Sequence, residues 1–450
     1  MIPIIPAKEA AAVTDTIFAL ATPAGGALAV IRISGAETRQ IIEKTFTQRL
    51  THARMTHGFV VDGETRLDEA MAVYFEAPKS YTGEDMAELS THGGRAAVSR
   101  VLALLSRYAR HAEPGEFTRR AFLNGKLDLA QAEAVQDMIA ANSERGAALA
   151  LEQLQGSVSR AVKAAEQRLL DALSGIDAAI DYPEELEDDV FSALPEALQQ
   201  AEREIAALLE VGMKQKVYRE GARVVLLGRP NAGKSSLLNA LLGYERAIVT
   251  PVAGTTRDVI EEETLFFDVP VRLTDTAGMR ESGDEAERIG VSRAKSAAEQ
   301  ADFLLLAFDG AETLDESDKE LLASTADRPR MAVVCKSDLG TKVSATEIEK
   351  EYGVFAASVS ALTGSGVAEL KKEVVQRLAP EAESALVTNA RHIAALIKAR
   401  EALQSAIATK DAELIATDLR DALRFLGEIT GETVDDAVLD RIFERFCVGK

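Results

Sequence analysis

The stretch from Gly228 to Ser235, which reads GRPNAGKS, constrains the fold of this 450-residue chain more than any other part of it. It follows the apolar run 224–227 and leads into the leucine-rich segment 236–242, so it predicts a strand, a glycine-rich turn and a helix. Such a turn directs backbone N–H groups and a helix N-terminus toward one point, which suits a phosphate group. Lys234 would neutralise phosphates there, and the Ser235 hydroxyl would be a ligand for Mg²⁺.

Strand and helix signals alternate around this stretch, between residues 222 and 376. The predicted strands are Val224–Leu227, Thr264–Phe267, Val271–Thr274, Phe303–Phe308, Met331–Val334 and Val354–Ala357. Alternation of this kind is typical of a mostly parallel, doubly wound α/β sheet. We therefore expect an α/β domain over residues 218–378.

The flanking residues predict two further kinds of structure, so that the whole chain is a multidomain α+β and α/β protein. Residues 1–120 mix short strand signals with helix signals, which indicates a small α+β domain. Residues 121–217 and 379–450 are both rich in Ala, Leu and Glu, and we expect one discontinuous all-α helical domain into which the α/β domain is inserted. Within its first part, Pro183 and the acidic run Glu184–Asp189 predict a loop.

Charge is distributed unevenly along the chain. The formal net charge is −21, yet positive and negative side chains balance within residues 1–125. A polyanion would therefore meet the N-terminal region first, unless a partner protein supplies the positive surface. No apolar run is long enough to span a membrane and no secretory signal is recognisable, so we expect a cytoplasmic protein. Its two cysteines, Cys335 and Cys447, cannot form a disulfide framework.

Three more loops complete the pattern of a nucleotide site. In the polar loop 250–258, Thr256 is a candidate Mg²⁺ ligand, and Asp275 ends a predicted strand as acids beside Mg²⁺ often do. The carboxylate of Asp338 can accept two N–H bonds from guanine, a pair that adenine does not offer. The predicted GTP-binding residues are Asn231, Ala232, Gly233, Lys234, Ser235, Ser236, Thr250, Pro251, Val252, Ala253, Gly254, Thr255, Thr256, Asp275, Thr276, Ala277, Gly278, Lys336, Asp338, Ser360, Ala361 and Leu362. Their order resembles the nucleotide-binding elements of the Ras-like GTPases.

Two positions depart from the Ras-like pattern. Met279 stands where those proteins carry a Gln that positions the attacking water, so another group must orient the water here. Cys335 stands where the base-binding motif usually carries an Asn. Loss of one neutral hydrogen bond would weaken nucleotide binding by about 0.5–1.5 kcal/mol. Asp338 should keep the preference for guanine.

Motifs in three regions resemble the MnmE (TrmE) family of tRNA modification GTPases, and the likeness runs from Thr14 to Lys450. Besides the glycine-rich turn and the loop 250–258, the matching motifs are Ala21–Pro23, Arg32–Gly35, Tyr81–Asp85, His92–Gly94, Pro114–Phe117, Ala121–Glu133, Asp284–Gly290 and Cys447–Lys450. The resemblance implies an N-terminal folate-binding domain that dimerises, a helical domain, and an inserted Ras-like G domain. In that family K⁺ takes the place of an arginine finger when two G domains meet across their nucleotides.

The resemblance also implies a reaction. Members of the family are K⁺-stimulated GTP hydrolases that work with an FAD-dependent partner of the MnmG (GidA) type in a heterotetramer. Together they add an aminomethyl-type group to C5 of the wobble uridine of certain tRNAs. A tetrahydrofolate derivative of the 5-formyl or methylene type is the one-carbon donor.

Individual roles follow from the matching positions. Glu287 corresponds to the family's catalytic carboxylate, which would orient the water in place of Met279, and Cys447 lies near the folate with a role in modification. The implied K⁺ site consists of Asn231, Thr250, Val252 and Thr255, and the implied folate-binding residues are Arg32, Glu88, Lys126 and Lys450. From the sequence alone each of those four would read as an ordinary surface charge, so their assignment depends on the resemblance.

Two other functions remain open from the sequence. A ribosome-assembly GTPase of the Era or Der type would share the nucleotide site, but such proteins carry a basic RNA-binding appendage and this chain is acidic. A folate-dependent methyl transferase with a vestigial G domain would share the N-terminal motifs. The intact Lys234, Ser235, Thr256 and Asp275 argue against that second alternative.

Overall fold

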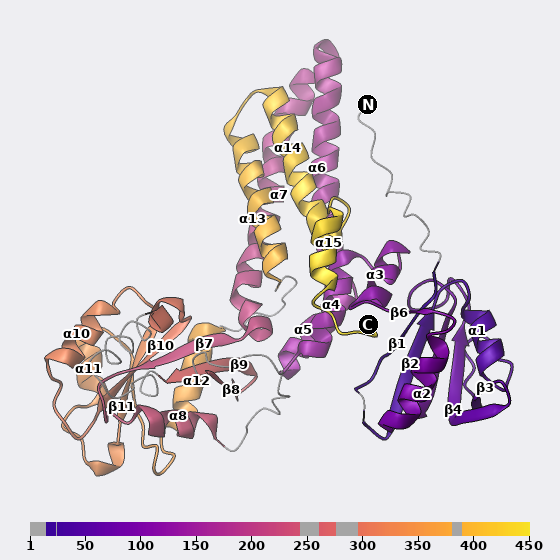
Figure 1. Cartoon of the computed structure of the whole chain (residues 1–450). Coiled ribbons are helices and arrows are strands. Elements are labelled where there is room, and N and C mark those ends of the chain that lie inside the picture. The colour runs from indigo at the N-terminus through magenta and orange to yellow at the C-terminus, as the bar shows by residue number, and fades with distance from the viewer. Residues whose placement is uncertain (1–14, 24, 244–260, 276–295, 380–388) are drawn as a thin grey trace. The chain divides into compact units, whose positions relative to one another are not determined.

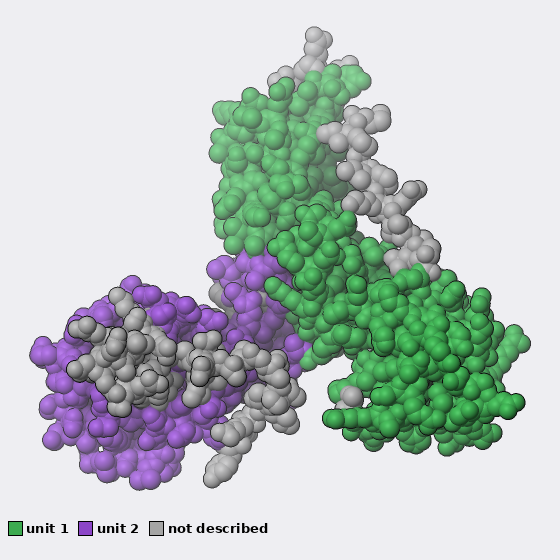
Figure 2. All heavy atoms as spheres, in the orientation of Figure 1, with its two compact units in different colours: residues 1–139, 151–205, 394–450 green, residues 140–150, 206–393 purple. Residues whose placement is uncertain are grey.

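The computed structural model describes residues 15–23, 25–243, 261–275, 296–379 and 389–450 (Figure 1). The chain forms two compact units (Figure 2). The first comprises residues 1–139, 151–205 and 394–450, and the second comprises residues 140–150 and 206–393. The finer division into segments 1–120, 121–217, 218–378 and 379–450 stays a prediction.

The first unit contains a six-stranded sheet in the order β3-β4-β5-β2-β1-β6. Its strands are β1 (Ile17–Leu20), β2 (Leu28–Ser34), β3 (Thr56–Asp62), β4 (Thr65–Phe75), β5 (Met86–His92) and β6 (Arg110–His111). Neighbours are antiparallel except β1 and β6, which are parallel. Helices α1 (Thr38–Thr45) and α2 (Arg95–Leu105) cover one face and share a core with it. Alternation along β2 therefore buries Ile31 and Ile33 beneath the helices and turns Arg32 to the other face.

Two stretches of the chain are helical, as the sequence predicts. The helices of the two helical stretches are α3 (Glu116–Leu123), α4 (Leu129–Ala140), α5 (Glu144–Leu154), α6 (Ser157–Asp181), α7 (Pro183–Glu220), α13 (Ala390–Ala408), α14 (Ala412–Thr430) and α15 (Asp436–Phe443). Most of α5, the end of α7 and the start of α13 belong to the second unit. Helix α14 packs along α6, and Arg420 of α14 pairs with Asp177 of α6 at 2.8 Å. Arg400 of α13 likewise pairs with Glu202 of α7 at 2.7 Å. Among the described helices, none has the length and apolar character that a membrane span needs.

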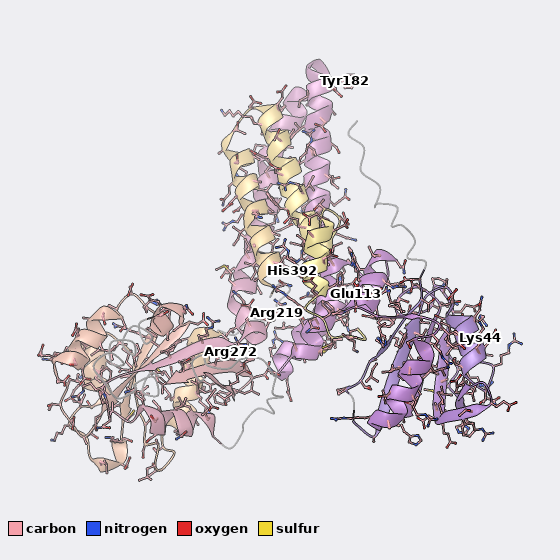
Figure 3. The ribbon with its side chains drawn as sticks, viewed as in Figure 1. Lys44, Glu113, Tyr182, Arg219, Arg272 and His392 are labelled. Atoms are coloured by element: carbon pink, nitrogen blue, oxygen red, sulfur yellow. The ribbon has the colours of Figure 1, made fainter. Side chains whose placement is uncertain are left out.

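The loop predicted at the acidic run Glu184–Asp189 is wrong. Those residues belong to α7, and Tyr182 alone separates that helix from α6 (Figure 3). Proline is favoured at the first position of a helix because its missing N–H has no helical partner there, and Pro183 holds that position. Acidic residues in the first turns of a helix are stabilised by the helix dipole, so the charge run favours a helix start over a loop.

The second unit contains the predicted doubly wound sheet, in the order β12-β11-β10-β7-β9-β8. Its strands are β7 (Ala222–Leu227), β8 (Glu261–Phe266), β9 (Val269–Asp275), β10 (Phe303–Asp309), β11 (Arg330–Cys335) and β12 (Ala356–Ser358). Among the described residues, the helical segments that follow its strands include α8 (Lys234–Leu242), α10 (Glu316–Ser324), the 3₁₀ turn Ser337–Leu339, α11 (Ala345–Tyr352) and α12 (Val367–Leu378). All neighbouring strands are parallel except β8 and β9, which form an antiparallel edge. Separate apolar cores cover the two faces, so every residue of β10 is buried.

Candidate functional site

The glycine-rich turn leaves the central strand β7 in a conformation that only glycine adopts without strain. Gly228 has φ of +148°, and a Cβ there would lie 2.3 Å from the carbonyl oxygen of Ala307. Gly233 has φ of +98° and caps the N-terminus of α8, where a Cβ would lie 3.1 Å from that of Cys335. The turn is therefore wedged between the ends of β10 and β11, and its backbone can approach a ligand closely.

Lys234 occupies the inside of this turn. Its side chain is 5% exposed, and its Nζ donates to the carbonyl oxygens of Gly228 at 2.9 Å and Arg229 at 2.6 Å. Ser235 and Ser236 follow it, exposed, in the first turn of α8. A positive charge, a serine hydroxyl and a helix N-terminus thus meet at one point, which is the arrangement that phosphates and Mg²⁺ require.

Asn231 and Ala232 lie at the tip of the turn. Asn231 is exposed and has φ of +65°, a left-handed conformation that asparagine tolerates better than most residues. Ala232 is buried. Asn231 therefore lies at the exposed rim of the turn.

The predicted base-binding residues meet at the ends of β11 and β12. Oδ1 of Asp338 accepts a hydrogen bond from the hydroxyl of Ser360 at 2.5 Å, and Ser360 is 1% exposed. Ala361 is half-buried and Leu362 is 85% exposed. The carboxylate of Asp338 is exposed and fixed in direction, as guanine recognition requires.

Lys336 forms an ion pair with Asp309, which is not among the residues predicted from the sequence. Its Nζ lies 2.6 Å from Oδ2 of Asp309, the last residue of β10. Burial by itself would raise the pKa of Asp309, but the hydrogen bonds from Lys336 and from the Ala311 N–H outweigh burial and hold the pKa below its usual value. Asp309 could have been found from the sequence, because it is an acidic residue at the end of a predicted interior strand of a parallel sheet, where ligands bind.

Cys335 lies beneath the turn as a neutral thiol. It is 4% exposed, and burial first, with the charge of Asp309 second, raises its pKa to about 12. Its Sγ lies 3.8 Å from the carbonyl oxygen of Val333, which is a weak contact. The amide that an Asn would offer at this position is therefore replaced by apolar packing against Gly233.

A second cluster of predicted residues lies on the first sheet. Arg32 of β2 faces Glu88 of β5, and Oε1 of Glu88 lies 2.9 Å from its Nε and 2.8 Å from its Nη2. The rings of Tyr81 and Phe117 lie 5.5 and 5.6 Å from the guanidinium carbon. Nη1 of Arg32 donates to the carbonyl oxygen of Gly449 at 3.1 Å. The C-terminus is thus brought onto the face of the sheet that α1 and α2 leave uncovered.

The remaining residues of this cluster lie around that contact. Cys447 is exposed, and its carbonyl oxygen accepts from the Gly115 N–H at 3.3 Å, while Lys450 is half-buried at the chain end. Lys126 donates to the carbonyl oxygen of Pro78 at 3.1 Å, on the loop that leads to Tyr81. The structure therefore joins Arg32, Glu88 and the C-terminal segment directly and sets Lys126 against a neighbouring loop.

Several predicted residues lie outside the described part of the chain. They are Thr250, Pro251, Val252, Ala253, Gly254, Thr255, Thr256, Thr276, Ala277, Gly278 and Glu287. The backbone of Asp275 ends β9, and its side chain is not described. In the described residues no group of three or more His, Cys, Asp or Glu could hold a metal ion. The roles predicted for these residues stay predictions.

Comparisons with known proteins match nearly the whole chain. A family model described as the MnmE helical domain matches residues 129–447, and one described as the GTP-binding protein TrmE N-terminus matches residues 16–126. The tRNA modification GTPase MnmE of Roseiflexus castenholzii is 45% identical over 464 residues, covering 97% of this chain and 99% of that protein. The same-named proteins of Chloroflexus aurantiacus (45% over 453 residues, 97% and 100%) and Natranaerobius thermophilus (41% over 455 residues, 97% and 99%) are similar. Among solved structures, the G domain of the T. maritima FeoB iron transporter is 26% identical, and the alignment covers 35% of this chain and 98% of that domain with a TM-score of 0.28.

Proposed function

This chain belongs to the MnmE family of tRNA modification GTPases and is a GTP-hydrolysing enzyme, and on this premise we propose the finer function that its two sites support. Its GTP hydrolysis is stimulated by K⁺. With an FAD-dependent partner of the MnmG type, the homodimeric protein acts in the cytoplasm to add an aminomethyl-type group to C5 of the wobble uridine of certain tRNAs. A tetrahydrofolate derivative bound on the first sheet supplies the carbon.

The observation that carries the folate proposal is the contact of Arg32 with both Glu88 and the Gly449 carbonyl. A carboxylate matches the amino and N–H edge of a pterin, cations match the carboxylates of its glutamate tail, and aromatic rings match its flat surface. The residues present fit that chemistry, because Glu88 supplies the carboxylate, Arg32, Lys126 and Lys450 the cations, and Tyr81 a ring. Cys447 is an exposed thiol within the same C-terminal segment.

The chemistry of the turn supports the metal-ion proposals. The Ser235 hydroxyl at the start of α8 suits Mg²⁺, with Thr256 as its predicted second ligand. The amide oxygen of Asn231, exposed at the rim, suits K⁺, with Thr250, Val252 and Thr255 completing the predicted site. K⁺ bound there would add positive charge beside the β and γ phosphates, where negative charge develops during hydrolysis. Glu287 is the proposed group that orients the water.

The K⁺ proposal is tested by GTP turnover of the full-length protein in KCl and in NaCl at equal ionic strength. We expect KCl to raise the turnover at least about tenfold, and we expect Asn231→Ala to remove most of that difference. Asn239→Ala is the matched control, because Asn239 is also exposed but lies on α8 away from the turn. Equal turnover of the unmodified protein in the two salts would contradict the K⁺ role.

The modification proposal is tested in a deletion strain of the source organism that carries plasmid copies of the gene. Mass spectrometry of tRNA nucleosides should find the modified wobble uridine with the unmodified gene and not with Arg32→Ala. Arg39→Ala is the control, because Arg39 lies on α1 and pairs with an exposed Glu76. Normal modification in the Arg32→Ala strain would contradict the folate site, and unchanged wobble uridines in the deletion strain itself would contradict the whole reaction.

A further inference from the structure

Arg229, the second residue of the glycine-rich turn, is clamped by three carboxylates that belong to none of the predicted nucleotide loops. Its Nη1 lies 2.6 Å from Oδ2 of Asp315, and its Nη2 lies 3.4 Å from Oε2 of Glu312. Its Nε lies 3.0 Å from Oδ2 of Asp318, close enough for an ion pair but without the alignment of a hydrogen bond. Glu312 and Asp315 lie between β10 and α10, and Asp318 lies in the first turn of α10. The turn is thus tied by its side chain to a segment about 85 residues further along the chain.

The carboxylate side of this clamp is fixed before it meets Arg229. Asp315 is the N-cap of α10, and its Oδ1 accepts from the Asp318 N–H at 3.0 Å. Oδ2 of Asp318 in turn accepts from the Asp315 N–H at 3.2 Å, which completes a capping box. Asp318 is 1% exposed. Because two acids are held by backbone groups, little side-chain entropy is lost when the guanidinium binds them, so the clamp is stiffer than an ordinary surface ion pair.

The backbone of the same residue holds the phosphate-binding lysine. The carbonyl oxygen of Arg229 accepts from Nζ of Lys234 at 2.6 Å and from the Ala232 N–H at 3.4 Å. A rotation of the Arg229 peptide would therefore move one of the carbonyl oxygens to which Nζ of Lys234 donates. The guanidinium clamp opposes that rotation, because it fixes the side chain of the same residue on α10.

We propose that Arg229 is a positioning residue for nucleotide binding. The clamp to Asp315 and Asp318 fixes the first peptide of the turn, and this peptide holds Lys234 where the β and γ phosphates bind. Preorganisation of a charged group improves binding of the phosphate that the group contacts and leaves the rest of the ligand unaffected. Arg229 should therefore act on the β phosphate through Lys234 and should have no effect on guanine recognition.

The test compares the affinities of GDP and GMP, measured by displacement of a fluorescent GDP analogue from the full-length protein. GMP lacks the β phosphate, so it does not report on the position of Lys234. For Arg229→Gln we expect GDP affinity to fall about tenfold and GMP affinity to change less than about twofold. For Arg229→Lys, which retains a charge but not the forked geometry, we expect part of the GDP affinity to return.

Two further variants make the result specific. Asp315→Asn keeps a side-chain oxygen for the cap and removes one charge of the clamp, so it should lower GDP affinity and should add little to Arg229→Gln in the double variant. Arg377→Gln is the matched control, because Arg377 pairs with Glu373 within α12 of the same unit. The proposal is overturned if Arg229→Gln lowers GDP and GMP affinities by the same factor, if it leaves GDP affinity unchanged, or if the two substitutions act additively.

Discussion

The two six-stranded sheets of this protein present their candidate ligand-binding residues in different ways. In the first, mostly antiparallel sheet, helices cover one face, and Arg32 and Glu88 lie opposite each other in the middle of adjacent strands on the other face. In the second, mostly parallel sheet, apolar cores cover both faces, and the candidate residues lie just beyond the strand ends. A sheet buried on both faces leaves only its carboxyl-terminal edge for a ligand, whereas a sheet with one uncovered face can bind a ligand on that face.

Because of this difference, different kinds of interaction fix the geometry of the two sites. At the second sheet the turn residues are adjacent in sequence, so local backbone conformation sets most of the geometry, as at Gly228, and the Arg229 clamp adds one long-range tie. At the first sheet the Arg32 contacts come from β5 and from the C-terminus, 56 and 417 residues away. Substitutions should therefore damage the second site through backbone strain and the first through loss of long-range pairing.

The largest effect is expected from Gly228→Ala. A Cβ 2.3 Å from the Ala307 oxygen, on a residue with φ of +148°, forces the turn and β10 apart. We expect the free energy of unfolding of the second unit to fall by more than about 3 kcal/mol, with loss of GDP binding. The measurements are urea unfolding and fluorescent-nucleotide titration. Gly63→Ala is the control from the first sheet, because its φ is +58° but no atom lies within 4 Å of the added Cβ, and it should cost about 1 kcal/mol.

A smaller effect is expected from Glu88→Ala, which leaves the Arg32 guanidinium, 14% exposed, without its carboxylate. The free energy of unfolding of the first unit should fall by about 2 kcal/mol. Binding of 5-formyltetrahydrofolate, measured by calorimetry, should be lost, while GTP turnover should stay within about twofold because the nucleotide loops lie in the other unit. Glu76→Ala is the control, since its 3.5 Å pair with Arg39 is exposed and should contribute less than about 0.5 kcal/mol. If the Glu88→Ala variant still bound the folate, Glu88 would not be a folate-binding residue.

A modest gain is expected from Cys335→Asn, which restores the usual amide at the second site. GDP affinity should rise roughly two- to tenfold, as one recovered hydrogen bond predicts. The measurement is fluorescent-nucleotide titration, with Cys447→Ser as the control because Cys447 lies in the first unit. A lower affinity would mean instead that the larger side chain displaces Gly233, whose Cβ position is already 3.1 Å from that of Cys335.

The smallest effect is a pH dependence that separates the sheets. On the first sheet a hydrogen bond to Asp68, at 2.7 Å, raises the pKa of His92. Because the folded pKa is the higher one, this pair stabilises the fold below the unfolded pKa of about 6.5 and loses its contribution as pH rises through the folded value. The difference in Tm between the unmodified protein and His92→Gln should therefore be largest near about pH 5.5 and vanish near about pH 8.5. A pH-independent difference would contradict this origin.

The ion pair at the second sheet should show no pH dependence over this range. The pKa of Asp309 is lowered by Lys336, so this pair contributes fully above the unfolded pKa of about 3.9 and loses its contribution only as pH falls through the lower folded value. An Asp309→Asn variant should therefore differ from the unmodified protein by a constant amount between about pH 5.5 and pH 8.5. A difference that varied across this range would mean that another group titrates with Asp309.

Features that depend on neighbouring residues could be predicted from the sequence. The turn of Gly228 and Gly233, the strand before it and the helix after it were all predicted, because steric limits on φ and the periodicity of apolar residues act locally. The acidic run Glu184–Asp189 shows the limit of that approach, since the same residues suit a solvated loop or the start of a helix.

Contacts between residues far apart in the chain could not be predicted and are seen only in the folded structure. Asp268, in the turn between β8 and β9, accepts from the Glu144 and Arg145 N–H groups at 2.8 and 2.5 Å and so caps α5 across more than 120 residues. The Arg229 clamp and the Arg32 contact with Gly449 are of the same kind. A charged side chain can pair with any oppositely charged side chain or unpaired backbone N–H group that lies close to it. The sequence contains many such groups for each charge, so it does not identify the one that is used. The order of the strands and the packing of the helices bring one of these possible partners within about 3 Å of the charge, and local sequence patterns do not predict which one.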